Sequence, residues 1–134
     1  MTWEKGRLPA RAFILPPLVA LAALPAGCGG GAGLYDARAT QKCLGARGLA
    51  TSHADADFIA RTAPNGSYLV TVSPTRVNVS FWQSHDDAEH ELDAYGAFGA
   101  GDDALMYVKG NAVLAWEDTP TGEERSRVDG CLGS

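Results

Sequence analysis

The chain of 134 residues has the length of one domain, and its hydrophobic fraction of 46% and charged fraction of 20% are those of an ordinary globular protein. The part of the chain that follows Cys28 holds 8 basic and 15 acidic residues, which give it a formal net charge of −7. Because phosphate contacts need clustered Lys and Arg, this composition excludes nucleic acid as a partner, and it also excludes electrostatic adhesion to an anionic membrane.

The first 27 residues have the three parts of a secretory signal. Residues 1–11 are net positive, residues 12–26 form an apolar run, and Ala26 and Gly27 supply small side chains at its end. The apolar run has 15 residues, three of them prolines, whereas a helix that spans a bilayer needs about 20 apolar residues. We therefore predict that residues 1–27 are a signal peptide and that the protein is exported.

Residues 24–28 resemble the bacterial lipobox, in which small residues precede a cysteine that is lipidated and becomes the mature N-terminus. Ala26, Gly27 and Cys28 match the pattern, and Pro25 departs from it, since an aliphatic residue is usual there. The resemblance implies a lipid on Cys28 that anchors the protein to the outer face of the cytoplasmic membrane. Cleavage by the ordinary signal peptidase, which yields a secreted protein, and an uncleaved anchor are the alternatives.

After the leader, residues 28–34 combine the lipid-accepting cysteine with a Gly-rich tether, and residues 35–134 form a single domain. If Cys28 is lipidated, Cys43 and Cys131 are left as a pair in an oxidising compartment, and we predict a disulfide between them. Two buried free thiols are the alternative. A redox-active pair is not expected, because the chain has no Cys-x-x-Cys motif.

The elements of the domain follow from hydrophobic periodicity and from turn and capping signals. Ser84 and Asp87 form a capping box at the start of the clearest helix, and Gly110-Asn111 is typical of a tight hairpin turn. Residues 49–52 are a candidate short strand, and residues 55–63 a short helix or turn. In chain order we expect a helix over 35–46, a hairpin of strands 67–73 and 76–82 joined by Pro74-Thr75, a helix over 84–98, a hairpin of strands 105–108 and 112–116, and a last helix from Thr119-Pro120 to Cys131.

This order, α-ββ-α-ββ-α, predicts an α+β domain. We expect two layers: an antiparallel sheet of four or five strands, built from the two hairpins, with the helices on one face.

Three further features widen the resemblance. Tyr35 stands eight residues before Cys43-Leu44, residues 110–116 read Gly-Asn-Ala-Val-Leu-Ala-Trp, and residues 119–125 read Thr-Pro-Thr-Gly-Glu-Glu-Arg ahead of Cys131. Together they look like small lipoproteins of high-GC Gram-positive bacteria to which no activity is assigned. That resemblance implies no activity, cofactor or partner.

The densest polar segment of the chain runs from His85 to Glu91. On a helix, His85 and Glu89 are neighbours, as are Asp86 and His90, so the segment offers two or three ligands to Zn²⁺ or a similar ion. It lacks the His-Glu-x-x-His spacing and divides its ligands between two faces, which favours a solvated helix face. No Gly-x-Ser-x-Gly motif is present, so we expect no catalytic residue and no cofactor. Metal binding by His85, Glu89 and His90 is the alternative.

Two tryptophans point to a contact surface. On the second strand, Trp82 alternates with Val79 and Phe81 and falls on the opposite face. If helices cover one face of the sheet, Trp82 and Trp116 lie on the open face, where they could bind a partner protein or a cell-wall glycan. The alternative is a second small core beneath residues 55–63. The sequence thus favours a lipid-anchored, non-catalytic binding or structural module.

Overall fold

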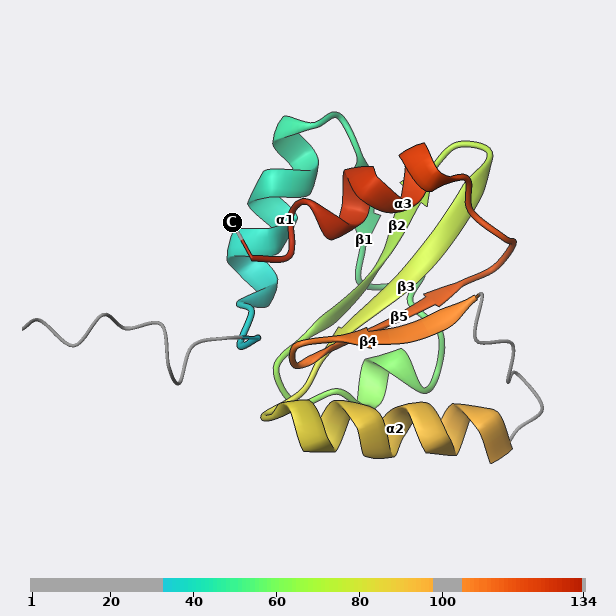
Figure 1. Ribbon diagram of the computed structural model, residues 1–134. Coiled ribbons are helices and arrows are strands. Elements are labelled where there is room, and N and C mark those ends of the chain that lie inside the picture. The colour runs from blue at the N-terminus through green and yellow to red at the C-terminus, as the bar shows by residue number, and fades with distance from the viewer. Residues whose placement is uncertain (1–32, 98–104, 134) are drawn as a thin grey trace, which may run out of the picture.

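The computed structural model describes residues 33–97 and 105–133. The expected signal peptide, Cys28 and most of the expected tether lie outside these residues. Among the helices of the described ranges, none combines the length and apolar character needed to cross a bilayer. The elements, shown in Figure 1, are α1 (Ala37–Ala46), β1 (Ala50–Ser52), the 3₁₀ turn η1 (Ala60–Thr62), β2 (Ser67–Val72), β3 (Thr75–Phe81), α2 (His85–Ala97), β4 (Met106–Lys109), β5 (Ala112–Trp116) and α3 (Gly122–Asp129).

The strands form one antiparallel sheet in the order β1-β2-β3-β5-β4. Ser73-Pro74 joins β2 to β3 through a cis peptide bond, one residue earlier than the expected Pro74-Thr75 turn. Gly110-Asn111 joins β4 to β5 as expected, and Gly110 has a φ of 58°, which glycine adopts without steric cost. The α+β class, the antiparallel sheet and the order of helices and hairpins are confirmed.

The helices cover both faces of this sheet, whereas the sequence predicts them on one. α1 and α3 contribute to one core and α2 to a second core on the other side of the sheet (Figure 1). All five residues of β5 are buried: Leu114 and Trp116 enter the first core, Val113 and Ala115 the second. A strand that is buried on both faces needs a covering layer on each side. The expected single helical layer is therefore wrong, and the domain has a helix–sheet–helix arrangement.

Polar residues of β3 are buried in the second interface because each has a hydrogen-bond partner. Asn78 is 7% exposed, and its Oδ1 accepts from the backbone N–H of Asp57 at 2.8 Å. Ser80 Oγ accepts from Trp82 Nε1 at 3.0 Å. The Tyr95 hydroxyl of α2 donates to Asp57 Oδ1 at 3.0 Å, and burial raises the pKa of Tyr95, so the hydroxyl stays protonated. These bonds join α2 and the segment before η1 to the sheet.

Side-chain caps fix where the three α-helices begin. At α2, Ser84 Oγ accepts from the backbone N–H of Asp87 at 3.0 Å. Asp36 is the N-cap of α1, and its carboxylate accepts from the backbone N–H of Ala39 at 2.7 Å. α3 begins at Gly122, later than the expected start at Thr119-Pro120, because Thr121 forms a capping box with Glu124.

The predicted disulfide is present between Cys43 of α1 and Cys131, which follows α3. The S–S distance is 2.07 Å and the Cα–Cα distance is 5.6 Å. Two arginines reinforce the same junction: Arg47 Nη1 donates to the carbonyl of Arg127 at 3.0 Å, and Arg127 Nη2 donates to the carbonyl of Arg47 at 3.3 Å. The two ends of the domain are thus joined covalently and by reciprocal hydrogen bonds.

Removing the disulfide should destabilise the domain strongly. The bond closes a loop with a sequence separation of 88 residues, and the chain-entropy model gives roughly 4 to 5 kcal/mol for a loop of this length. We expect the Cys43→Ser/Cys131→Ser variant to lose stability of this order in urea denaturation. The variant should not respond to a reducing agent, whereas the oxidised wild type should. Equal stability of the oxidised and reduced wild type would contradict the prediction.

Candidate functional site

Trp116 lies in the core that the sheet shares with α1 and α3. The residue is 4% exposed, and its Nε1 donates to the Tyr107 hydroxyl at 3.2 Å. Tyr107 donates in turn to Asp129 Oδ1 of α3 at 2.7 Å. The expectation that Trp116 lies on an open sheet face is wrong, because that face is covered and the polar edge of the indole already has a partner inside the domain.

Trp82 lies at the margin of the second core. It is partly buried against that core together with Ile59 and Leu92. This position agrees with the alternative interpretation, a second core beneath residues 55–63. Because α2 and the η1 segment cover this face, the two tryptophans do not form one exposed surface.

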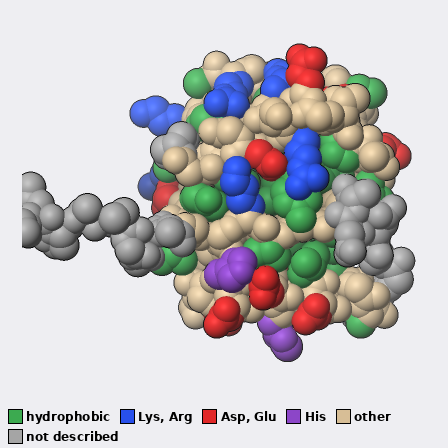
Figure 2. Space-filling model, in the orientation of Figure 1, with side chains coloured by type: hydrophobic (Ala, Val, Ile, Leu, Met, Phe, Trp, Pro, Cys, Tyr) green, Lys and Arg blue, Asp and Glu red, His purple; other side chains and the backbone are tan. Residues whose placement is uncertain are grey.

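The His85 segment forms the start of α2. His85 Nε2 lies 3.2 Å from Glu89 Oε1, and both side chains are exposed. In the described part of the chain no three His, Cys, Asp or Glu side chains gather closely enough to hold a metal ion. Figure 2 shows histidine and acidic side chains along the edge of the molecule where α2 runs. The structure thus brings His85 and Glu89 together as a surface ion pair and does not assemble them with His90 into a metal site.

The other ring nitrogen of His85 ties α2 to the β4–β5 turn. Nδ1 donates to the Gly110 carbonyl at 2.7 Å. This hydrogen bond is the main reason why the pKa of His85 is raised above 6.5, and the Glu89 and Asp86 carboxylates act in the same direction. The protonated ring is therefore the form that this junction favours.

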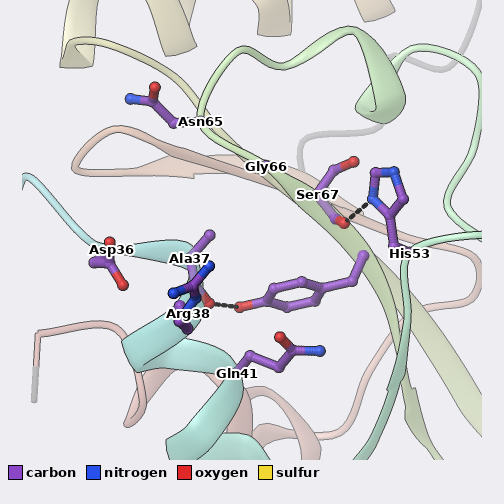
Figure 3. Close-up of a pocket in the computed structure, with 9 residues that line it drawn as sticks. Asp36, Ala37, Arg38, Gln41, His53, Asn65, Gly66 and Ser67 are labelled. Carbon is purple, nitrogen blue, oxygen red and sulfur yellow. Dashed lines mark hydrogen bonds between the residues drawn. The ribbon is translucent and has the colours of Figure 1, made fainter.

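A polar depression of about 590 Å³ lies between the start of α1 and the start of β2, beside the segment that follows β1 (Figure 3). Three stretches of the chain supply its lining. Its lining residues with polar side chains are Asp36, Arg38, Gln41, His53, Asn65, Ser67 and Tyr68.

Tyr68 forms the inner wall of this depression. The residue is 3% exposed, and its hydroxyl donates to the Ala37 carbonyl of α1 at 3.0 Å (Figure 3). Burial, together with the nearby Asp36 carboxylate, raises the pKa of Tyr68, which keeps the hydroxyl protonated as a donor. Gly66 lets α1 approach, because a Cβ at this position would lie 3.2 Å from Cβ of Ala37 and the φ is 108°. The hydrogen bond and the close approach of α1 therefore fix the position of this wall.

Most of the other polar groups of the depression are held by internal hydrogen bonds. Gln41 Nε2 donates to Thr51 Oγ1 at 2.8 Å, and Asn65 Nδ2 donates to the Trp82 carbonyl at 3.1 Å. His53 Nδ1 donates to the Ser67 carbonyl at 2.7 Å, as Figure 3 shows. These bonds orient an imidazole and two side-chain amides around the depression.

Arg38 differs from these neighbours. It is exposed, and its guanidinium makes no hydrogen bond or ion pair with another described residue. A guanidinium has five N–H donors, so Arg38 is the strongest donor that the depression offers to an incoming group. The arrangement suits a polar partner with several hydrogen-bonding groups.

The sequence alone does not indicate this site. Arg38, His53 and Asn65 are far apart in the chain, and no motif or spacing connects them. The one signal in the sequence is the turn at Asn65-Gly66, which marks the start of β2. Comparison with protein-family models, with curated proteins and with solved structures finds no match to this chain.

His85 should titrate above pH 6.5 in the folded protein. The Gly110 carbonyl and the Glu89 carboxylate both favour the protonated ring. Because the folded state binds this proton more tightly than the unfolded state, the stabilisation is present in full below pH 6.5 and is lost as the pH rises through the folded-state pKa. NMR titration of the ring measures the pKa. Glu89→Gln should lower it without bringing it down to 6.5, and a wild-type value at or below 6.5 would show the prediction to be wrong.

Proposed function

We propose that this chain is an exported lipoprotein, anchored through Cys28, whose domain is a non-catalytic binding module on the outer side of the cytoplasmic membrane. The domain contacts its partner through the depression between α1 and β2. The partner is a polar polymer of the cell envelope, such as cell-wall glycan with its attached peptides.

Two observations support the location. The first is the Cys43–Cys131 disulfide, because such bonds persist mainly in oxidising compartments outside the cytoplasm. The second is the N-terminal sequence, with its basic start, apolar run and small residues before Cys28. The disulfide uses the other two cysteines of the chain, which leaves Cys28 as the single candidate for lipidation.

The binding proposal depends on a difference between the polar side chains of the depression: most are bonded internally, and that of Arg38 is not. Gln41, His53 and Asn65 are oriented by internal hydrogen bonds, whereas the exposed guanidinium of Arg38 has no partner among the described residues. Ordered acceptors and donors around one available cation match the hydroxyl, amide and carboxylate groups of cell-wall fragments. A binding role is favoured over catalysis because, within the described ranges, no serine or threonine hydroxyl is hydrogen-bonded to a histidine ring.

Mass spectrometry of the mature N-terminus tests the anchor. We expect the membrane-bound protein to begin at Cys28 and to carry acyl chains on that residue. Cys28→Ser should remain uncleaved or leave the membrane fraction, because the lipid is the attachment. A wild-type chain that begins downstream of Cys28 without lipid would overturn the anchor.

NMR titration with soluble, muramidase-released cell-wall fragments tests the depression. We expect shifts in the amide signals of Arg38, Gln41 and His53. Arg38→Ala should weaken binding roughly tenfold, the order expected for the loss of one charged hydrogen bond.

Arg61→Ala is the matched control, because Arg61 is an exposed arginine of η1 outside the depression. It removes the same charge and should leave the affinity unchanged. Equal losses in both variants would mean that only net charge matters, and unchanged signals around the depression would overturn this site.

A further inference from the structure

The segment that immediately precedes α1 is bonded to the tip of the β4–β5 hairpin. Asn111 makes this attachment and is 2% exposed. Its side-chain Oδ1 accepts from the backbone N–H of Tyr35 at 2.5 Å, and its Nδ2 donates to the carbonyls of Tyr35 at 3.2 Å and Trp82 at 2.8 Å. Its backbone N–H donates to the Gly33 carbonyl at 2.5 Å. We call this set of bonds the Asn111 latch.

Two glycines allow the latch to close. A Cβ on Gly33 would lie 2.8 Å from Cα of Gly110, and a Cβ on Gly110 would overlap the backbone of Gly33. Both residues have positive φ, 88° for Gly33 and 58° for Gly110. The backbones therefore touch at a point where any side chain would push them apart, and the chain is held to the domain from Gly33 onward.

The latch makes the tether shorter than residues 28–34, the length expected from the sequence. Residues 28–34 are expected to lie between the lipid and the domain, but Gly33 is already held against the hairpin. Five residue steps separate Cys28 from Gly33, and even a fully extended chain spans only about 17 Å over that distance. A domain of about 100 residues has a radius of gyration of about 13 Å, so its full width is at least about 26 Å and exceeds this reach.

We propose that the Asn111 latch makes the domain stand on the outer leaflet with one defined end against the bilayer, an inference that rests on the lipid anchor proposed above. This membrane-proximal end contains the β4–β5 turn, the start of α1 and the start of α2, and the β2–β3 turn lies at the opposite end (Figure 1). The partner of this surface is the bilayer that holds the chain's own lipid.

The side chains of the membrane-proximal end are consistent with a short tether, and not charge attraction, holding this end against the bilayer. Leu34 is an apolar residue that is 53% exposed beside the latch. His85 is exposed, and its ring bonds to Gly110 in the same turn. Among the described residues that are exposed there, Asp36 and Asp86 are acidic and offset the charge of Arg38 near the start of α1, so this end offers anionic lipid little attraction. Without its lipid, the domain should therefore not bind vesicles.

Paramagnetic broadening tests the orientation. The ¹⁵N-labelled mature chain, carrying its lipid, is inserted into phosphatidylcholine bicelles that contain a gadolinium-chelating lipid. We expect the amide signals of Leu34, His85 and Gly110 to lose intensity several-fold more than those of Arg76 and Glu117, an ion pair near the β2–β3 turn. The Cys28→Ser chain that begins at residue 28, without leader or lipid, should show no broadening.

Two asparagines provide a matched pair for the latch. Asn65 and Asn111 both donate to the Trp82 carbonyl, but only Asn111 also bonds Tyr35. Asn111→Ala should make the broadening uniform, whereas Asn65→Ala should keep the gradient. A Gly-Ser insertion between Gly30 and Gly31, longer than the width of the domain, should also make it uniform and leaves the folded part unchanged.

The outcomes separate the two proposals. Uniform broadening of the lipidated wild type, or a gradient that survives both the insertion and Asn111→Ala, would overturn the orientation and leave the lipid anchor standing. A mature chain without lipid, found by mass spectrometry, would overturn the anchor and the orientation together.

Discussion

Burial of β5 on both of its faces is the constraint on which the rest of this structure depends. Leu114 and Trp116 fill the core beside α1 and α3, and Val113 and Ala115 fill the core beside α2. At roughly 25 cal/mol per Å² of apolar surface removed from water, neither face of such a strand can be left uncovered without a substantial loss of stability. The positions of all three helices follow from this requirement.

The polar groups that accompany this burial hold the outer layers in register. Trp116 donates to Tyr107, and Tyr107 donates to Asp129 of α3, so one chain of hydrogen bonds runs from the core to a helix. Burial raises the pKa of Tyr107, which keeps its hydroxyl protonated in this chain. On the other side, Asp57 accepts from Tyr95 and links α2 to the segment before η1. The aromatic residues that looked suited to binding are therefore used for internal structure.

The surface that is left for function is polar. The depression between α1 and β2 combines the Arg38 guanidinium with oriented amide and imidazole groups, and the N-terminal segment is held to the β4–β5 turn close by. Asp36 belongs to both regions, as the N-cap of α1 and as part of the depression's lining. If the chain is lipid-anchored, the latch places this depression near the membrane.

The sequence by itself determined the elements, because hydrophobic periodicity, Gly110-Asn111 and the Ser84 cap act over a few residues. It also indicated the Cys43–Cys131 pair, since the number of cysteines limits the pairings. It did not determine which faces of the sheet are covered. Asn78 and Ser80 are polar residues on a face that the structure covers, and only tertiary hydrogen bonds make their burial possible.

The depression and the Asn111 latch were likewise decided by the tertiary structure alone. Each joins residues that are distant in the chain: Arg38 and Asn65 line the same depression, and Asn111 bonds Tyr35 over 76 positions. No local pattern encodes such contacts, because they depend on how the packed layers bring the segments together. A repeated local signal specifies a helix or a strand. The depression and the latch form only when the helices have packed on both faces of the sheet.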